Sequence, residues 1–398
     1  MKISKYIFFI FLVFLSTQVL AQSNEQTIEQ LIKQGYHKMG NDSIESSPII
    51  YKKNSLVFLK VIINGKEYLF LFDTGASICL ISEEIASQSA VQNTIHFTDE
   101  YENKSKANVV LQNIQIGNSS FNNIVCVVND MKILTTLGCV KIDGIIGANL
   151  INLCNWKIDP VKNLLSFSKS TFKKQEISEL ELEIKYTGNG LPLIKLNYDN
   201  TPFYTLIDFG FSDYLELNND ILKKSKKIRK TNQIKGFGIH SLTINSIIES
   251  KVSRLLIDTL RSESFTLINV PTTLNESKPK IGSSLLKRYL VKLNSLEQKL
   301  ILTPLQYIDS TTLSFPIKFG LNDLNEIIIN FIWETEDTKN LGLKIGQKVI
   351  KIDNKEFNNL SNSDLCELKD QLNQKSSINI TILVGNKLRE VQLSKIIM

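Results

Sequence analysis

The sequence of 398 residues predicts a mostly β protein with two homologous lobes, followed by a smaller α+β domain at its C-terminus. Three observations lead to this prediction. The first half repeats at a fixed distance further along, short apolar runs alternate with turn residues, and the repeat stops past Pro304. Hydrophobic residues make up 42% of the sequence and charged residues 22%, which is ordinary for globular proteins and suits two or three domains of this total length.

The internal repeat places Asp208 in the second copy where Asp73 stands in the first. It aligns Leu-Phe-Asp-Thr-Gly-Ala-Ser around the first Asp with Leu-Ile-Asp-Phe-Gly-Phe-Ser around the second. Each copy later continues with an apolar residue and a glycine, and Gly147 follows Asp73 at the same distance as Gly282 follows Asp208. Because the register is kept without a gap over so long a span, we infer two homologous lobes.

Each lobe is predicted to consist of many short strands. Two apolar runs flank Asn64-Gly65, a strong signal for a β-hairpin. Short strands with turns at close intervals are typical of closed or sandwiched β structures. The expected strands and short helices include Leu56–Val61, Tyr68–Phe72, Asn108–Leu111, Ile124–Val128, Ser82–Ser89 and Leu285–Tyr289.

The Asp-x-Gly sequences place an ionisable side chain directly after a strand whose residues should be buried. A buried charge is costly unless hydrogen bonds or a function compensate for it. Gly75 allows the backbone to turn sharply and exposes amides near the carboxylate of Asp73. A simple Asx turn at a strand end is the structural alternative. Two copies, each with a matching later glycine, favour a functional site.

These motifs resemble the aspartic peptidases of the pepsin and retropepsin kind over residues 50–305. In that family each lobe contributes an Asp-Thr/Ser-Gly loop, and a later apolar-apolar-Gly step lies against it. Asp143–Leu150 is close to the first-lobe form of that step. The resemblance implies two catalytic carboxylates, Asp73 and Asp208, supported by the loop residues Thr74, Gly75, Ala76, Gly210, Gly147 and Gly282.

The implied chemistry needs no metal and no organic cofactor. Two carboxylates a few ångströms apart hold one proton between them, because ionising both is costly. The ionised member takes a proton from a bound water, and the protonated member donates to the scissile carbonyl. The five cysteines and three histidines match no zinc-site spacing. Both lobes belong to one polypeptide, so a monomer suffices for the site.

Two departures from the family pattern bear on activity. Phe209 stands where Thr or Ser is usual, which removes the hydroxyl expected to meet Thr74 across the lobe interface. A catalytically weak or inactive peptide-binding protein is therefore the alternative function. Ala76 and Phe211 follow the two glycines and offer no side-chain donor. Losing donors to the ionised form raises a carboxyl pKa, so activity is predicted at mildly acidic to neutral pH.

Two loops are candidates for lining the cleft. Tyr101, within residues 99–103, is a possible flap residue, the alternative being an exposed loop tyrosine. The matching second-lobe segment Lys235–Gly238, Lys-Gly-Phe-Gly, either lines the cleft or forms a flexible turn.

The last ninety residues resemble a PDZ domain of the bacterial peptidase-associated type. Gly342–Ile350 matches its Gly-Leu-x-x-Gly-Asp-x-Ile segment, with Gln347 in place of Asp. A helix over Ser361–Leu372 and a final hairpin are expected to follow. By analogy Phe319, Gly320 and Leu321 form the loop that would hold a peptide C-terminus. A purely structural use of this domain is the alternative.

The N-terminus predicts export to a periplasm or secretion. Lys2 and Lys5 precede the apolar run Ile7–Leu15, which is typical of a signal peptide cut after Ala21. A membrane anchor is the alternative, but nine residues fall short of the ~20 that span a bilayer. The predicted organisation is a signal peptide (1–21), an N-terminal extension or short propeptide (22–48), lobe 1 (49–170), lobe 2 (171–306) and a PDZ-like domain (307–398).

The net charge and the cysteine count limit the binding partners and disulfides to be expected. Removing residues 1–21 takes two positive charges from the formal +6 and leaves +4 (6 − 2). That value gives no support for nucleic acid binding, and the basic run 223–230 is interpreted as a solvated helix face or loop. The expected partners are a polypeptide substrate and a peptide C-terminus, with no transmembrane span after processing. The odd number of cysteines, five, leaves at least one unpaired within a monomer.

Overall fold

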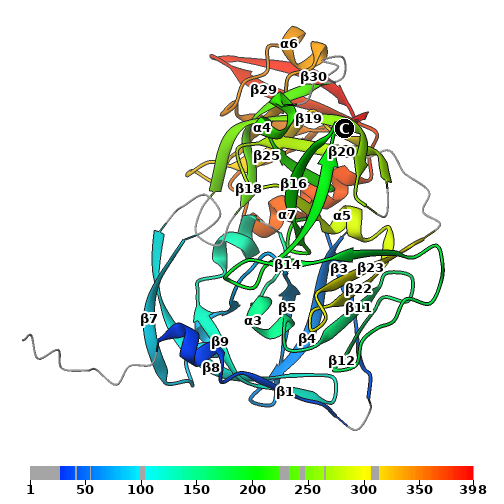
Figure 1. Cartoon of the computed structure of the whole chain (residues 1–398). Helices are drawn as coiled ribbons and strands as arrows, with labels where there is room; N and C mark the ends of the chain where they lie inside the picture. Colours follow the sequence, from blue (N-terminus) through cyan, green and yellow to red (C-terminus); the bar gives the residue numbers. More distant parts are fainter. Residues whose placement is uncertain are drawn as a thin grey trace, which may run out of the picture.

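A computed structural model confirms a mostly β protein with a double-lobed body and a further domain beside it (Figure 1). It describes residues 27–40, 43–53, 55–98, 104–137, 139–224, 233–242, 247–263, 266–305 and 313–397. The predicted signal peptide lies outside the described residues, as does Tyr101. No helix in the described ranges is long and apolar enough to cross a membrane.

Lobe 1 is built on a nine-stranded sheet in the order β1-β9-β6-β10-β5-β4-β8-β7, with β3 paired to β4. The predicted hairpin at Asn64-Gly65 is confirmed, since both residues have positive φ, 50° and 76°, in the turn between β4 and β5. The strands are β1 (Tyr36–Lys38), β3 (Ile50–Lys52), β4 (Leu56–Ile63), β5 (Lys66–Phe72), β6 (Cys79–Ile81), β7 (Val91–Thr98), β8 (Lys104–Ile116), β9 (Ser119–Val128) and β10 (Gly144–Ile146).

Lobe 2 repeats this plan and shares its sheet with the C-terminal domain. The ten strands run in the order β14-β15-β16-β21-β17-β20-β19-β18-β26-β25. They are β14 (Lys185–Tyr186), β15 (Pro192–Tyr198), β16 (Thr201–Asp208), β17 (Leu215–Asn218), β18 (Ile234–Leu242), β19 (Ile247–Arg261), β20 (Thr266–Asn275), β21 (Lys280–Gly282), β25 (Ile317–Leu321) and β26 (Ile327–Trp333).

A six-stranded sheet, β13-β23-β22-β11-β12-β2, joins the two lobes. Its centre lies where β11 pairs antiparallel with β22 and Lys157 faces Lys292. These two residues occupy equivalent positions of the sequence repeat, so the pseudo-twofold axis passes between them. The strands are β2 (Glu45–Pro48), β11 (Asn155–Asp159), β12 (Leu164–Ser168), β13 (Leu180–Glu183), β22 (Tyr289–Asn294) and β23 (Lys299–Pro304).

The C-terminal domain, residues 313–397, has a hydrophobic core of its own. Leu365, Leu368 and Leu372 on one face of helix α7 pack into that core, as the sequence predicted. The four-stranded sheet β28-β27-β29-β30 and the short pair β24–β31 complete the domain. The strands are β24 (Leu313–Ser314), β27 (Val349–Ile352), β28 (Lys355–Glu356), β29 (Ser377–Val384), β30 (Lys387–Ser394) and β31 (Ile396–Ile397).

Helices are short except for α7. They are α1 (Ile28–Ile32), α2 (Glu83–Ala86), the π-helical segment η1 (Ile133–Leu137), α3 (Ala148–Ile151), α4 (Asn219–Lys223), α5 (Ser283–Leu286), α6 (Glu336–Asn340) and α7 (Asn362–Asn373). α3 and α5 begin directly after Gly147 and Gly282, at equivalent places in the two lobes. The duplication predicted from sequence therefore extends to the turns that follow the glycine steps.

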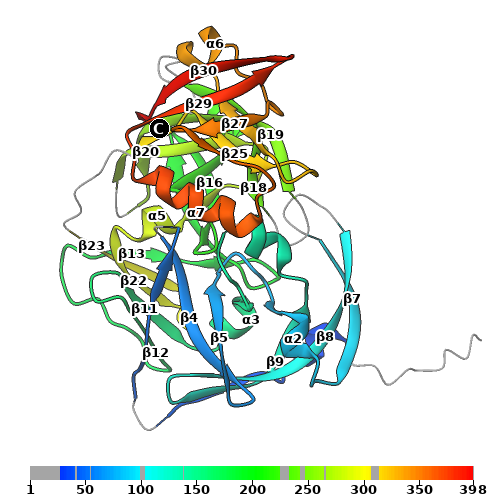
Figure 2. The same ribbon diagram turned by 180° about the vertical axis from the view of Figure 1, so that it is seen from behind.

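The C-terminal domain is attached to both lobes. Strand β26 pairs with β18, so the domain extends the second-lobe hairpin β18–β19. A disulfide joins Cys139 in lobe 1 to Cys366 on α7, across 227 residues of sequence. Figure 2 shows α7 at the boundary between this domain and the lobes. The remaining cysteines, Cys79, Cys126 and Cys154, are free and buried.

The described part of the predicted N-terminal extension is built into lobe 1. β1 pairs with β9, and β2 pairs with β12 in the sheet that joins the lobes. His37 on β1 stacks on Phe121 with 4.3 Å between ring centroids and is buried. Residues 27–40 and 43–48, which lie within the predicted N-terminal extension (22–48), therefore contribute strands and core contacts to lobe 1.

Candidate active site

Asp73 lies immediately after strand β5, where the backbone leaves the lobe 1 sheet. β10 runs parallel to β5, with Ile146 opposite Phe72. The amide of Asp73 donates to the carbonyl of Ile146 at 3.0 Å, which fixes the start of the loop. The predicted apolar-apolar-Gly step thus lies directly against the Asp-Thr-Gly loop.

Asp208 occupies the corresponding place in lobe 2. It is the last residue of β16 and lies opposite Gly282 of the parallel strand β21. Its side chain is largely buried, with 8% of the residue exposed. Two strands, related by the repeat, therefore present the two predicted carboxylates.

Each carboxylate is held by backbone amides of its own loop. Asp73 Oδ1 accepts from the amides of Gly75 at 2.7 Å and Ala76 at 3.2 Å. In lobe 2 the Oδ1 of Asp208 accepts from the amides of Gly210 and Phe211, at 2.9 and 3.1 Å. Amides that point at a carboxylate stabilise its ionised form.

The two loops meet so that each carboxyl group lies over the glycine of the other loop. A Cβ atom on Gly75 would lie 2.7 Å from Cγ and both oxygens of Asp208. A Cβ atom on Gly210 would collide with the carboxyl group of Asp73. The structure therefore brings Asp73 and Asp208 together across the pseudo-twofold axis, and only glycine fits at the two positions between them.

Gly147 and Gly282 are glycines for a second steric reason. A Cβ atom on Gly147 would lie 2.6 Å from the backbone carbon of Ile78, and one on Gly282 would meet the side chain of Phe211 at 2.6 Å. The segment that leaves each Asp-x-Gly loop passes directly over these positions. A larger residue would push that loop away from its carboxylate.

Thr74 supplies the hydroxyl that locks the two loops. Its Oγ1 donates to the carbonyl of Ile207 at 2.6 Å and accepts from the amide of Phe209 at 3.0 Å. Both partners are backbone groups of the opposite loop. The sequence predicts that Thr74 has no hydroxyl partner in the second loop; in the structure its partners are the backbone groups of Ile207 and Phe209.

Phe209 points away from the loops into the shared core. It is 2% exposed, and its ring packs edge-on against Phe72, with 5.7 Å between centroids. Phe72 in turn packs edge-on against Trp156 of the sheet that joins the lobes. The aromatic side chain therefore fills apolar space and leaves its own amide free for Thr74.

Four serines form a second contact between the lobes, which was not predicted from the sequence. Ser55 of lobe 1 donates to the carbonyl of Ser212 at 3.0 Å. The hydroxyls of Ser283 and Ser284 both reach Ser55 Oγ, at 2.9 and 3.1 Å. A serine before a strand carries no recognisable signal in sequence.

The second loop is one residue longer than the first. The sequence repeat aligns Ser77 with Ser212 and Asn149 with Ser284. In lobe 1 the amide of Asn149 donates to the carbonyl of Ser77. In lobe 2 the amide of Ser284 donates to the carbonyl of Asp213, one residue after Ser212. Ser212 is the extra residue, and it supplies the carbonyl that contacts lobe 1.

The segment Lys235–Gly238 is a strand and not a turn. It lies in β18 and pairs with β19 on one side and β26 on the other. A Cβ atom on Gly236 would lie 2.5 Å from the ring of Phe331. The glycines, which suggested a turn, instead allow the C-terminal domain to pack closely on the second-lobe hairpin.

Phe319, Gly320 and Leu321 are also strand residues. They form the end of β25 and pair with Ile327–Ile329 of β26. The side chain of Phe319 is 4% exposed and belongs to the domain core. The predicted loop for a peptide C-terminus is therefore not at this position; the other edge of β25 has no paired strand among the described residues.

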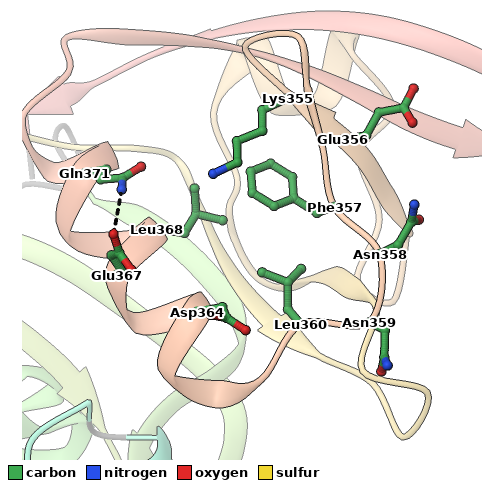
Figure 3. Close-up of a pocket in the computed structure, with 10 residues that line it drawn as sticks. All are labelled: Lys355, Glu356, Phe357, Asn358, Asn359, Leu360, Asp364, Glu367, Leu368 and Gln371. Atoms are coloured by element: carbon green, nitrogen blue, oxygen red, sulfur yellow. Dashed lines mark hydrogen bonds between the residues drawn. The ribbon is translucent and has the colours of Figure 1, made fainter.

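One pocket, of about 240 Å³, lies on the C-terminal domain between the β28 region and helix α7 (Figure 3). Phe357, Leu360 and Leu368 form its apolar wall, with the ring and the two leucine side chains turned toward one another. Asp364 and Glu367 line the helix side. No residue of either Asp-x-Gly loop contributes to it, so it is separate from the two carboxylates.

Residues 59–150 match the family model described as aspartyl protease. This stretch contains Asp73, Thr74, Gly75, Ala76 and Gly147. A solved structure similar to this chain is that of Basic 7S globulin from soybean, with 9% identity and a TM-score of 0.39 over 66% of this chain and 94% of that one. No curated protein matches.

The match supports an aspartic protease relationship for lobe 1, and the structure shows the same loop a second time in lobe 2. In the described ranges no three or more His, Cys, Asp and Glu side chains are placed to hold a metal ion.

Proposed function

We propose that this protein is an exported aspartic endopeptidase, which hydrolyses peptide bonds with a water held between Asp73 and Asp208. The observation that carries the proposal is the reciprocal placement of the two loops, each carboxylate lying over the glycine of the other. An Asx turn alone would not require two distant loops to meet in this way. The aspartyl protease match over residues 59–150 supports the same interpretation.

In the proposed mechanism the carboxyl pair shares one proton. The ionised carboxylate accepts a proton from the water, and the water oxygen attacks the scissile carbonyl carbon. The protonated carboxyl group donates its proton to the carbonyl oxygen, giving a neutral tetrahedral diol. Collapse of the diol breaks the C–N bond: the carboxyl group that took the proton of the water donates it to the amide nitrogen, and the other carboxylate accepts the proton of a diol hydroxyl. The amides of Gly75 and Gly210 stabilise whichever carboxylate carries the charge.

Activity is favoured over a purely peptide-binding role by the contacts of Thr74. A protein that had lost catalysis would not need to keep the backbone of its second loop bound to Thr74. Here the amide of Phe209 and the carbonyl of Ile207 remain bound to one hydroxyl, and Asp208 keeps both amide donors. The change from Thr or Ser to Phe therefore leaves the carboxylate of the second lobe in place.

For the C-terminal domain we propose a PDZ-like role in binding peptide segments or a partner. The unpaired edge of β25 among the described residues would accept an added strand. Because β26 pairs with β18 of the second-lobe hairpin, a peptide bound at β25 would be held next to the catalytic lobes.

The test of the peptidase proposal uses protein that starts at Gln22 and an unfolded polypeptide as substrate, incubated across a range of pH. The variants are Asp73→Asn and Asp208→Asn, and a statine-type inhibitor is added in parallel. Asp258→Asn is the matched control, because it makes the same chemical change at an exposed position of lobe 2.

Cleavage by the wild type and by Asp258→Asn, lost in both site variants and blocked by the inhibitor, is the expected result. Cleavage that survives Asp73→Asn would show that another group performs the hydrolysis. Binding of the polypeptide without cleavage at any pH would favour the peptide-binding alternative.

A further inference from the structure

The second Asp-x-Gly loop, residues 208–213, differs from the first in two ways. Phe209 follows Asp208, so this loop has no hydroxyl beside its aspartate, and Ser212 is an additional residue. A longer loop has more conformations available to it, and contacts must exclude all but one of them if the carboxylate is to keep one position. The second loop therefore needs restraints that the first loop does not need.

Serine hydroxyls hold the end of the second loop. Ser55 Oγ donates to the carbonyl of Ser212 at 3.0 Å, and Ser284 Oγ donates to the same carbonyl at 2.6 Å. Ser283 Oγ lies 2.9 Å from the carbonyl oxygen of Phe211 and also 2.9 Å from Ser55 Oγ. Ser55 and Ser283 are 2% and 1% exposed, so water does not compete for these hydroxyls. The end of the second loop is thus fastened to lobe 1 through Ser55.

The equivalent place on the other side of the pseudo-twofold axis has no such hydroxyls. The sequence repeat aligns Ser55 with Gly190 and Ser283 with Ala148. The structure keeps this equivalence, because a Cβ atom on Gly190 would lie 3.7 Å from the Cβ of Ala148, where Ser55 meets Ser283 in the other half. Neither glycine nor alanine has a hydroxyl. Ser55 and Ser283 therefore provide hydroxyls on the side of the longer loop alone.

The contact of Ser55 is connected to Asp208 through the backbone of the second loop. Ser212 follows Phe211, whose amide donates to Oδ1 of Asp208 at 3.1 Å. The carbonyl of Phe211 also accepts from the amide of Ser283 at 2.7 Å. Because each peptide unit is planar, fixing the carbonyls of Phe211 and Ser212 limits the orientations open to the Phe211 amide. A donor to the Asp208 carboxylate thus depends on the serine contacts.

We propose that Ser55 is a positioning residue for Asp208. Its hydroxyl fixes the additional residue of the second loop, which keeps the Phe211 amide directed at the carboxylate. Thr74 holds the start of the same loop, so two hydroxyls of lobe 1 hold both of its ends. The inference rests on the proposed peptidase function, because positioning matters for the hydrolysis. The structural alternative is that Ser55 only joins the lobes and contributes to stability.

The experiment compares two buried serines that differ in their distance from the second loop along the hydrogen-bond network. Ser55→Ala removes the proposed contact. Ser166→Ala is the matched control, because Ser166 is also 2% exposed and its hydroxyl bonds to that of Ser46 at 2.9 Å in the sheet that joins the lobes. Ser283→Ala is a second test, since lobe 1 has Ala148 at the equivalent position and alanine is expected to fit.

Three measurements are made on each variant of the chain that starts at Gln22. Unfolding in denaturant gives the stability, and steady-state cleavage of an unfolded polypeptide gives kcat and KM. Hydrogen–deuterium exchange with mass spectrometry compares residues 208–213 of the second loop with residues 73–78 of the first. Exchange reports on the loop itself and needs no substrate.

We expect Ser55→Ala and Ser166→Ala to lose similar stability, since each removes one buried hydroxyl. Ser55→Ala alone should lower kcat, by about tenfold to 100-fold, with KM changed by less than about twofold, because misplacement of a catalytic group acts on the transition state. Its second loop should exchange about two- to tenfold faster, as the loss of a neutral hydrogen bond predicts, and its first loop should be unchanged. Ser283→Ala should act in the same direction.

The outcomes keep this inference and the proposed function apart. Cleavage by the wild type, with the same kcat in Ser55→Ala and Ser166→Ala, would support the peptidase and overturn the role of Ser55. Unchanged exchange in the second loop of Ser55→Ala would overturn it as well. Absence of cleavage by the wild type would refute the peptidase, while faster exchange confined to the second loop would still support Ser55 as the residue that fixes this loop. If Ser55→Ala fails to fold, the same measurements on Ser283→Ala decide.

Discussion

Replacing Thr74 by valine tests whether one hydroxyl is enough to hold two catalytic loops together. Valine keeps the shape of threonine, but it leaves the amide of Phe209 without its acceptor and the carbonyl of Ile207 without this donor. Thr74 is 1% exposed, so water cannot take the place of the hydroxyl. A buried polar group left unsatisfied costs about 1–3 kcal/mol, and two such groups cost about 2–6 kcal/mol of folding free energy.

The assay is unfolding in denaturant together with steady-state kinetics. Thr74→Val should lower the unfolding midpoint at an unchanged slope, and it should lower kcat as well, because a small misplacement of a catalytic group costs about 100-fold in rate. Thr74→Ser keeps the hydroxyl and is the matched control, expected to lose only about 0.5–1.5 kcal/mol for the missing methyl group. A valine variant with the midpoint and kcat of the wild type would refute the proposed role of this hydroxyl.

Three further predictions follow from contacts in the structure. Gly210→Ala should abolish cleavage, since its Cβ would collide with the Asp73 carboxyl group; peptide hydrolysis is the readout. Cys366→Ser opens a loop of 227 residues closed by Cys139, and chain-entropy arguments set an expected loss of up to about 5 kcal/mol in denaturant unfolding. Burial of Glu179 disfavours its ionised form and by itself would raise its pKa. Hydrogen bonds to the carboxylate, first among them that from Lys292, outweigh burial and lower the pKa from 4.5 to about 2. This stabilisation is complete above about pH 4.5 and is lost as pH falls toward 2, as unfolding at several pH values should show.

Each of these predictions has a result that contradicts it. For the glycine, Gly188→Ala is a control in open space, and equal activity of the two alanine variants would remove the steric argument. For the disulfide, Cys154→Ser changes a free cysteine, and a loss as large as that of Cys366→Ser would mean that packing rather than the cross-link matters. For the ion pair, Glu179→Gln should flatten the acid dependence, and an unchanged slope between pH 4.5 and 2 would exclude this carboxylate as its source.

The duplication and its two carboxylates were predictable because they depend on local sequence. A strand that ends in Asp-x-Gly and a later glycine step keep the same spacing in both copies, and the structure places Gly147 and Gly282 against the two loops. Gly75 was predicted to allow a sharp turn, and Gly210 to support the second loop. Both glycines also leave room for the carboxylate of the opposite loop. This role depends on how the lobes meet, so the sequence of either copy alone does not predict it.

Contacts between distant segments were not predictable from the sequence. The pairing of β18 with β26 depends on where the C-terminal domain docks, and the Lys-Gly-Phe-Gly sequence in β18 has the composition of a turn. The pairing of Cys139 with Cys366 depends on the same docking, because five cysteines permit many connections. Phe209 was interpreted as the loss of a hydroxyl that would bind Thr74. The sequence identifies side chains, whereas the group of Phe209 that binds Thr74 is its backbone amide.

The two lobes therefore share the amides that bind the carboxylates but differ in the side chain that follows each Asp. Both keep the amides that hold the carboxylates, as the proposed chemistry with two carboxylates at one water requires. Lobe 1 alone keeps the locking hydroxyl of Thr74, and one hydroxyl suffices because both of its partners are backbone groups. Lobe 2 has Phe209 at the matching position and the additional residue Ser212, whose carbonyl contacts lobe 1. Under the proposed function, changes at Thr74 should accordingly alter the rate for every substrate alike, because its hydroxyl holds both loops in place.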